Sequence, residues 1–129
     1  MVVVDTSVWI DLLQGHETPQ SVLLKRLPLE EEVCIPDLCL LEVLRGSKSD
    51  EHLEKTYEHL RSHTIVSIGG ESMALAAARN ARGLRTHGVQ AQLVDCLIAT
   101  YCVEQGLRLL TSDKGFDQIA EWLPLSLVR

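Results

Sequence analysis

Four acidic residues are the strongest candidates for chemistry because each lies in or beside an apolar stretch: Asp5, Glu42, Asp95 and Asp113. An unpaired carboxylate in an apolar environment costs free energy, so each side chain needs a cation or a hydrogen-bond partner. Carboxylates gathered in one site would also raise each other's pKa unless a divalent cation neutralised them. Because the candidate ligands are all oxygen atoms, the cation expected is Mg²⁺ or Mn²⁺.

A carboxylate-held metal ion would give these residues the chemistry of a nuclease. Such an ion can lower the pKa of a bound water, orient that water for in-line attack on a phosphodiester, and stabilise the leaving oxygen. The sequence therefore predicts a phosphodiester hydrolase, provided that folding brings the four acids together.

Each acid also has a purely structural interpretation. Asp5 and Asp95 could cap helices, since aspartate is a favoured N-cap residue. Asp113 could serve a turn, as could Asp117. Glu42 could form an ion pair with the arginine three residues later on the same helix. All of these interpretations would have to hold together to leave no site.

The elements that must position the acids alternate between short apolar strands and capped helices. Strands are expected at residues 2–4, 33–35, 64–68, 107–110 and 125–128. Helices are expected at residues 8–14, 19–27, 36–44, 49–62, 71–87, 94–105 and 116–122. This order predicts an α/β fold with parallel strands covered on both faces.

Two of the acids directly follow expected strands. Asp5 follows the strand at 2–4, and Asp113 comes shortly after the strand at 107–110. In open parallel sheets, ligands bind beyond the carboxyl ends of the strands, where the strand order changes direction. If these two strands are neighbours, the two carboxylates converge although they lie near opposite ends of the sequence.

Composition favours a single domain spanning residues 1–129. Hydrophobic residues make up 46% of the chain and aromatic residues only 4%, so an aliphatic core is expected. No apolar run approaches the roughly 20 residues that span a bilayer, so no membrane association is expected. The cysteines lie in apolar runs without a Cys-x-x-Cys pair, which favours a reduced, cytoplasmic compartment: Cys34, Cys39, Cys96 and Cys102.

Four segments of the chain resemble, in order, the motifs of PIN-domain ribonucleases. They read VVVDTSVWI at 2–10, LLEVLRG at 40–46, DCLIA at 95–99 and GLRLLTSDKGF at 106–116. The likeness is greatest to VapC, the toxin half of VapBC toxin–antitoxin pairs, and covers nearly the whole chain. It implies a three-layer PIN fold, with a central parallel sheet of four to five strands flanked by helices. It also implies Mg²⁺- or Mn²⁺-dependent endonucleolytic cleavage of RNA.

The resemblance also implies roles for particular residues. It assigns metal binding to Asp5, Glu42, Asp95 and Asp113, and less closely to Asp117. It implies that two threonines orient carboxylates or water by hydrogen bonds: Thr6 and Thr111. The family's usual acid one or two places before Phe116 is absent, because Lys114 and Gly115 stand there. That departure leaves a second metal ion in question.

The partners implied by the resemblance are an RNA substrate, a second copy of the chain in a homodimer, and a cognate antitoxin whose tail blocks the active site. The net charge of −6 argues against a protein that coats nucleic-acid duplexes, so RNA contact would need the metal and a local basic strip. Arg79, Arg82 and Arg85 recur every third residue and would form such a strip. A solvated helix face is the simpler interpretation of their spacing.

A phosphatase of the haloacid-dehalogenase type shares part of this pattern. Asp5 ends a first strand, and Asp113 to Asp117 gives a later Asp-x-x-x-Asp. The first motif of that class has a second, proton-shuttling aspartate where this chain has Ser7. The absence of that aspartate counts against the phosphatase.

Two further alternatives are not nucleases. Cys34-x4-Cys39 and His59-x3-His63 could hold zinc, but the gap between the pairs is longer than zinc-finger spacing and the cysteines sit in apolar runs. A PIN-fold interaction protein without turnover is the other alternative. The presence of all four matching acids favours the enzyme.

Overall fold

The structure, a computed structural model that describes residues 1–128, is built on a sheet of five parallel strands. The strands are β1 Val2–Val4, β2 Val33–Pro36, β3 Thr64–Val66, β4 Arg108–Leu110 and β5 Ser126–Leu127. Their spatial order is β3-β2-β1-β4-β5, so the direction of the strand order changes between β1 and β4. The predicted adjacency of these two strands is therefore confirmed. Arg129, the last residue of the predicted domain, lies outside the described residues.

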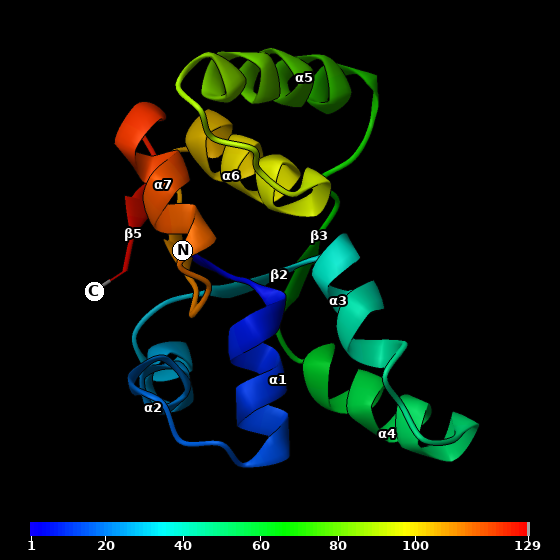
Figure 1. Cartoon of the computed structure of the whole chain (residues 1–129). Coiled ribbons are helices and arrows are strands. Elements are labelled where there is room, and N and C mark those ends of the chain that lie inside the picture. Colours follow the sequence, from blue (N-terminus) through cyan, green and yellow to red (C-terminus); the bar gives the residue numbers. More distant parts are fainter. Residues whose placement is uncertain (129) are drawn as a thin grey trace.

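Helices cover both faces of this sheet, as the sequence predicts. They are α1 Thr6–Gln14, α2 Pro19–Arg26, α3 Asp37–Leu44, α4 Asp50–Leu60, α5 Glu71–Thr86, α6 Leu93–Gln105 and α7 Gly115–Trp122. In Figure 1, α5 and α6 lie above the strands, and α1, α2 and α4 lie below them. The α/β architecture of helices, sheet and helices is confirmed.

The core is aliphatic and centres on the two inner strands. Every residue of β1 and β2 is buried, as parallel strands with helices on both faces require. Trp9 and Phe116 are the largest fully buried side chains, and the Trp9 indole Nε1 donates to the Val4 carbonyl oxygen at 3.1 Å. This bond ties the start of α1 to the end of β1.

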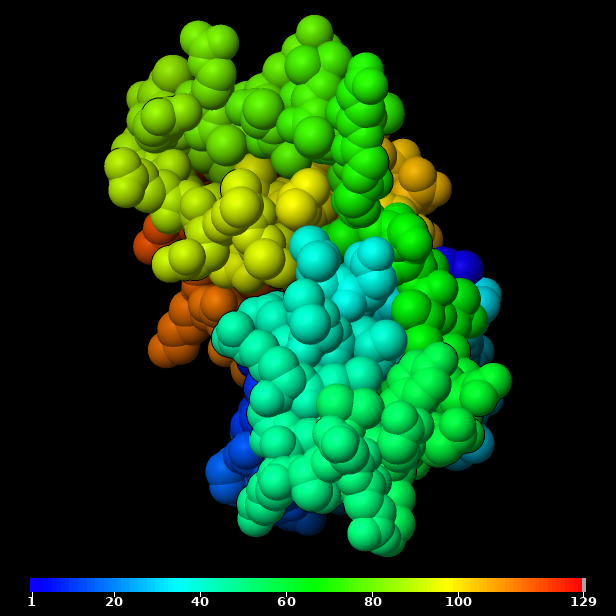
Figure 2. Space-filling model, turned by 90° about the vertical axis from the view of Figure 1, so that its right-hand side faces the viewer, coloured from blue at the N-terminus to red at the C-terminus, as the bar shows by residue number. Residues whose placement is uncertain are grey.

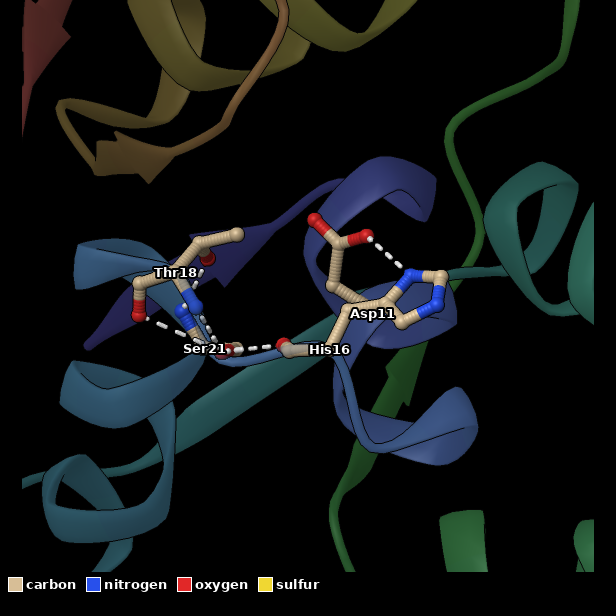
Figure 3. A network of polar contacts seen from close by, with 4 residues as sticks. All are labelled: Asp11, His16, Thr18 and Ser21. Atoms are coloured by element: carbon tan, nitrogen blue, oxygen red, sulfur yellow. Dashed lines mark hydrogen bonds and ion pairs between the residues drawn. The ribbon is translucent and has the colours of Figure 1, made fainter.

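Side-chain hydrogen bonds hold the α1–α2 connection, shown in Figure 3. Thr18 and Ser21 form a reciprocal capping box at the start of α2, with bonds of 2.9 and 3.0 Å. Ser21 Oγ also donates to the His16 carbonyl oxygen at 2.9 Å, and His16 Nδ1 lies 3.7 Å from Asp11 Oδ1. The connection is therefore fixed by local polar contacts, as capping boxes generally provide.

Several element boundaries differ from the prediction by one or more residues, and the structure gives the reason for two of them. The third strand was expected to reach Ile68 but ends at Val66, because the Ile68 amide donates to Asp37 Oδ1 at 3.3 Å instead of joining the sheet. The fourth strand begins after Leu107, whose amide closes α6 by bonding the Cys102 carbonyl oxygen at 2.9 Å. A short 3₁₀ helix, Leu27–Leu29, follows α2 and was not predicted.

The described residues contain no helix long and apolar enough to cross a membrane.

Candidate active site

Asp5 stands at the end of β1 with both carboxylate oxygens held. The side chain is only 4% exposed. Its Oδ1 accepts hydrogen bonds from the Ser7 amide at 3.0 Å and the Ser7 hydroxyl at 2.6 Å, and its Oδ2 accepts from the Thr111 hydroxyl at 2.7 Å. Asp5 is the N-cap of α1, so its capping interpretation is confirmed. The bond from Thr111 shows that it also has a partner beyond that helix.

The segment after β4 is fastened to the start of α1. The Asp5 amide donates to the Leu110 carbonyl oxygen at 3.1 Å, and the Ser112 amide donates to Ser7 Oγ at 3.2 Å. The Asp113 amide donates to Thr111 Oγ1 at 2.9 Å. These contacts place Asp5 and the Thr111–Asp113 turn at the point where the strand order changes direction, which is the usual ligand-binding position in such sheets.

Asp113 lies at the surface of this turn. Its Oδ1 accepts from the Gly115 amide at 2.8 Å, which confirms the turn interpretation. A Cβ atom at residue 115 would lie 3.2 Å from that oxygen, so glycine leaves room for the carboxylate. Asp117 lies one turn further on, in the first turn of α7.

Glu42 projects from α3 and is held by α1. The Thr6 hydroxyl donates to Glu42 Oε1 at 2.9 Å. The alternative ion pair with Arg45 is wrong, since no such pair occurs among residues 1–128 and Arg45 is exposed at the end of α3. The partner comes instead from α1 because α1 and α3 pack together.

Asp95 lies in the first turn of α6 and is half-buried. Its capping interpretation is wrong, because Gln92 is the N-cap residue and Asp95 lies three positions later. Burial, and after it the negative charges of Asp113, Asp5 and Glu42, raise the pKa of Asp95 to about 6. The other three predicted acids therefore lie within electrostatic range of Asp95, although the four come from separate segments.

We call these four residues the acidic cluster: Asp5, Glu42, Asp95 and Asp113. Figure 2 shows three of the contributing segments next to one another on one face, namely α3 in cyan, the start of α6 in yellow and the segment after β4 in orange. Burial also raises the pKa of Asp5, against the lowering effect of its hydrogen bonds from Ser7 and Thr111.

The acidic cluster suits a metal ion because of the type and charge of its donor atoms. No three His, Cys, Asp or Glu side chains of residues 1–128 stand close enough together to hold an ion as they are. The cluster nonetheless offers only oxygen donors, and it carries mutual repulsion that a divalent cation would neutralise. This donor set fits Mg²⁺ or Mn²⁺ better than a softer metal.

The zinc alternative finds no such support. The four cysteines are free and buried, and burial raises the pKa of Cys39 to about 12, which opposes formation of the thiolate that zinc needs. His59 and His63 line a separate groove beside Trp9. No charge or contact joins these histidines to Cys34 or Cys39 in the described part of the chain.

One feature of the site went beyond the sequence prediction. Ser7 supplies two hydrogen bonds to the Asp5 carboxylate, a role that the sequence analysis did not assign to it. Its position two residues after an N-cap aspartate was the available signal. As the resemblance implies, Thr6 and Thr111 each donate to one carboxylate of the acidic cluster, Glu42 and Asp5 respectively.

Fold and site together define an α/β protein with an acidic cluster at the switch point of a parallel sheet. The family model described as PIN domain matches residues 2–121. The chain therefore belongs to the PIN domain family, and this match displaces the phosphatase alternative.

Relatives and solved structures agree with that assignment. A VapC ribonuclease of Mycobacterium bovis and ribonuclease VapC11 of Mycobacterium tuberculosis are each 30% identical over 125 residues, covering 93% of this chain and 92% of the relative. VapBC2 from Rickettsia felis, solved bound to a DNA fragment from its promoter, superposes with a TM-score of 0.80 at 18% identity, covering 99% of this chain and 98% of that one. FitAcB from Neisseria gonorrhoeae gives a TM-score of 0.77 at 18% identity, with 100% and 97% covered.

Proposed function

We propose that this chain is a metal-dependent endoribonuclease and the toxin half of a VapBC-type toxin–antitoxin pair. One observation carries the proposal: at the switch point of the sheet, Asp5, Glu42 and Asp113 all come close enough to Asp95 for their charges to raise its pKa. The ribonuclease names of the relatives support the choice of RNA as substrate.

The acidic cluster would hold Mg²⁺ or Mn²⁺. When bound there, a divalent cation supplies charge neutralisation and activates water for attack on a phosphodiester. The chain itself keeps the carboxylates oriented: Ser7 and Thr111 hold the two oxygens of Asp5, and Thr6 holds one oxygen of Glu42. Asp95 and Asp113 complete the set. Such supporting hydrogen bonds keep ligands in place before the ion arrives.

The partners proposed are RNA, a cognate antitoxin and a second copy of the chain. Structural neighbours solved as VapBC assemblies support the antitoxin. The free, buried cysteines support a reduced cytoplasmic location. Arg79, Arg82 and Arg85 are all exposed on α5, where they would contact RNA phosphates.

The direct test is incubation of the purified chain, freed of antitoxin, with total RNA and Mn²⁺, beside the variant Asp5→Asn. We expect discrete fragments from the wild type, loss of cleavage with chelator, and no cleavage by the variant. Equal cutting by both proteins would show that Asp5 has no part in the reaction. No cutting by either would favour a PIN-fold interaction protein without turnover.

A further inference from the structure

A second groove of the molecule shares Glu42 with the acidic cluster. It encloses about 450 Å³, within the range of small-ligand sites. Its walls come from α1, α3, the α3–α4 connection and α4. The residues that matter for its chemistry are Ile10, Leu13, Gln14, Ser47, Lys48 and His52. We call it the Glu42 groove. Glu42 is therefore both a wall residue of this groove and a member of the acidic cluster.

One wall of the Glu42 groove suits a nucleotide base. Ile10 and Leu13 are three residues apart on α1 and therefore lie on one face of that helix, and Gln14 follows at the fourth position. Aliphatic side chains offer an apolar surface for the flat face of a base. The Gln14 amide has both donors and an acceptor for a base edge.

The α3–α4 connection supplies hydrogen-bond donors suited to a phosphate. Among the described residues that line the groove, Lys48 is the one whose side chain stays positively charged across the physiological pH range. Its backbone amide donates to His52 Nδ1 at 3.3 Å, so the neutral imidazole carries its proton on Nε2 and offers a second donor. The Ser49 hydroxyl fixes this arrangement by capping α4, accepting from the His52 amide at 3.0 Å.

A buried hydroxyl in the same groove has no partner. Ser47 Oγ lies out of contact with solvent, and no group among residues 1–128 hydrogen-bonds to it. A buried polar atom without a partner is costly, and most such atoms in native proteins are satisfied. Because the atom is closed to solvent, Ser47 would have to turn its side chain toward the groove before a ligand atom could satisfy the hydroxyl.

We propose that the Glu42 groove binds a nucleotide of the RNA strand adjacent to the cut phosphodiester, with Lys48 and His52 on its phosphate and Ile10 and Leu13 against its base. The proposal rests on the ribonuclease function proposed above, because that function brings an RNA strand to Glu42. The chain carries a net charge of −6, so an RNA strand needs local cations, and Lys48 supplies one in this groove.

The test measures the affinity of a short fluorescent single-stranded RNA for the full chain in Ca²⁺, where binding does not depend on turnover. We expect Lys48→Ala and His52→Ala each to raise Kd by about three- to tenfold, and Lys48→Arg to restore most of the affinity. Lys48→Ala should also reduce the slope of log affinity against log salt by about 0.7. A merely structural role would not change this slope.

Lys55→Ala is the matched control. Lys55 lies on α4 as His52 does, but it pairs with Glu51 at 3.3 Å and does not line the groove. Its loss should leave Kd within about twofold, as exposed ion pairs contribute little. Thermal midpoints of all variants establish that they fold.

Unchanged RNA affinity in both groove variants would overturn the proposal. If the same variants instead weakened only the complex with the antitoxin, the groove would be a protein-docking site and the proposal would again be wrong. The ribonuclease proposal and the groove proposal can fail separately. A chain that binds RNA through Lys48 but never cuts it would contradict the ribonuclease proposal and support the groove proposal.

Discussion

The Thr111 hydroxyl donates a 2.7 Å hydrogen bond to Asp5 Oδ2, joining the segment after β4 to the end of β1. Asp5 is buried, and burial raises its pKa, so the bond stabilises the charged form of a carboxylate that is otherwise poorly solvated. The contact exists because β1 and β4 are neighbours in the sheet. It therefore links the fold directly to the proposed chemistry.

Removing this bond should weaken both stability and activity. Thr111→Val keeps the shape of the side chain but leaves Asp5 Oδ2 without its donor, at a cost of about 1–3 kcal/mol in the free energy of unfolding. Thr111→Ser should recover most of the loss because it keeps the hydroxyl. Urea unfolding at neutral pH measures the change in the free energy of unfolding. A Thr111→Val variant as stable as the wild type would show that this hydrogen bond does not stabilise the fold.

The Thr6 hydroxyl should matter for metal affinity rather than for folding. It holds Glu42 from a neighbouring helix, and residues that orient a ligand typically change metal affinity by about 10- to 100-fold. We expect Thr6→Val to weaken Mn²⁺ binding by about tenfold in calorimetric titration. Thr86→Val, which removes only a hydroxyl bonded to the Gly83 carbonyl oxygen on α5, is the control. Equal affinities in both variants would argue against a role for Thr6.

Asp95 should lower the stability of the metal-free protein at neutral pH. Its pKa is about 6 in the folded chain against an ordinary value of 3.8, so the folded state holds the proton more tightly than the unfolded state. The resulting loss of folding stability begins as the pH rises above 3.8, the ordinary pKa of aspartate. It is complete once the pH is above about 6, the pKa of Asp95 in the folded chain. After a discount for solvent screening, it amounts to about 1–2 kcal/mol.

Asp95→Asn should therefore stabilise the metal-free chain by about this amount at neutral pH and by almost nothing below about pH 4. Chemical unfolding at both pH values, in the presence of chelator, measures the difference. Saturating Mn²⁺ should reverse the order, because the wild type gains more from the ion. A destabilised Asn variant at neutral pH in chelator would contradict the proposed repulsion.

The arginines of α5 should contribute to RNA binding through charge alone. Replacing Arg79, Arg82 and Arg85 with alanine should lower RNA affinity for all sequences alike and flatten its salt dependence. Fluorescence titration of unrelated RNA sequences at several salt concentrations provides the measurement. Unchanged affinity and salt dependence would show that these residues form only a solvated helix face.

The sequence predicted well those features that depend on residues close together in the chain. The strand at 2–4, the N-cap role of Asp5 and the end of α6 at residue 105 all follow from nearest-neighbour chemistry, and the structure confirms them. The approach of Asp5 to the Thr111–Asp113 turn was predicted on the condition that β1 and β4 are neighbours, and the structure meets that condition. The general rule for parallel sheets then places the ligand site at this point.

Contacts between elements were harder to predict because they depend on packing. Glu42 receives its hydrogen bond from Thr6 on another helix, whereas the sequence suggested a neighbour on the same helix. Asp95 lies three positions after the N-cap residue, Gln92, and so belongs to the first turn of α6 rather than to its cap. The end of β3 likewise depends on Asp37, which takes the Ile68 amide across the fold.

The central claim is that the acidic cluster binds one divalent ion among its four carboxylates. Anomalous diffraction from a crystal of the chain grown with Mn²⁺ tests it most directly. We predict a manganese peak within ligand distance, about 2.0–2.3 Å, of oxygens from Asp5 and at least two other members of the cluster. Ordered carboxylates that point away from one another, with no manganese between them, would contradict the account.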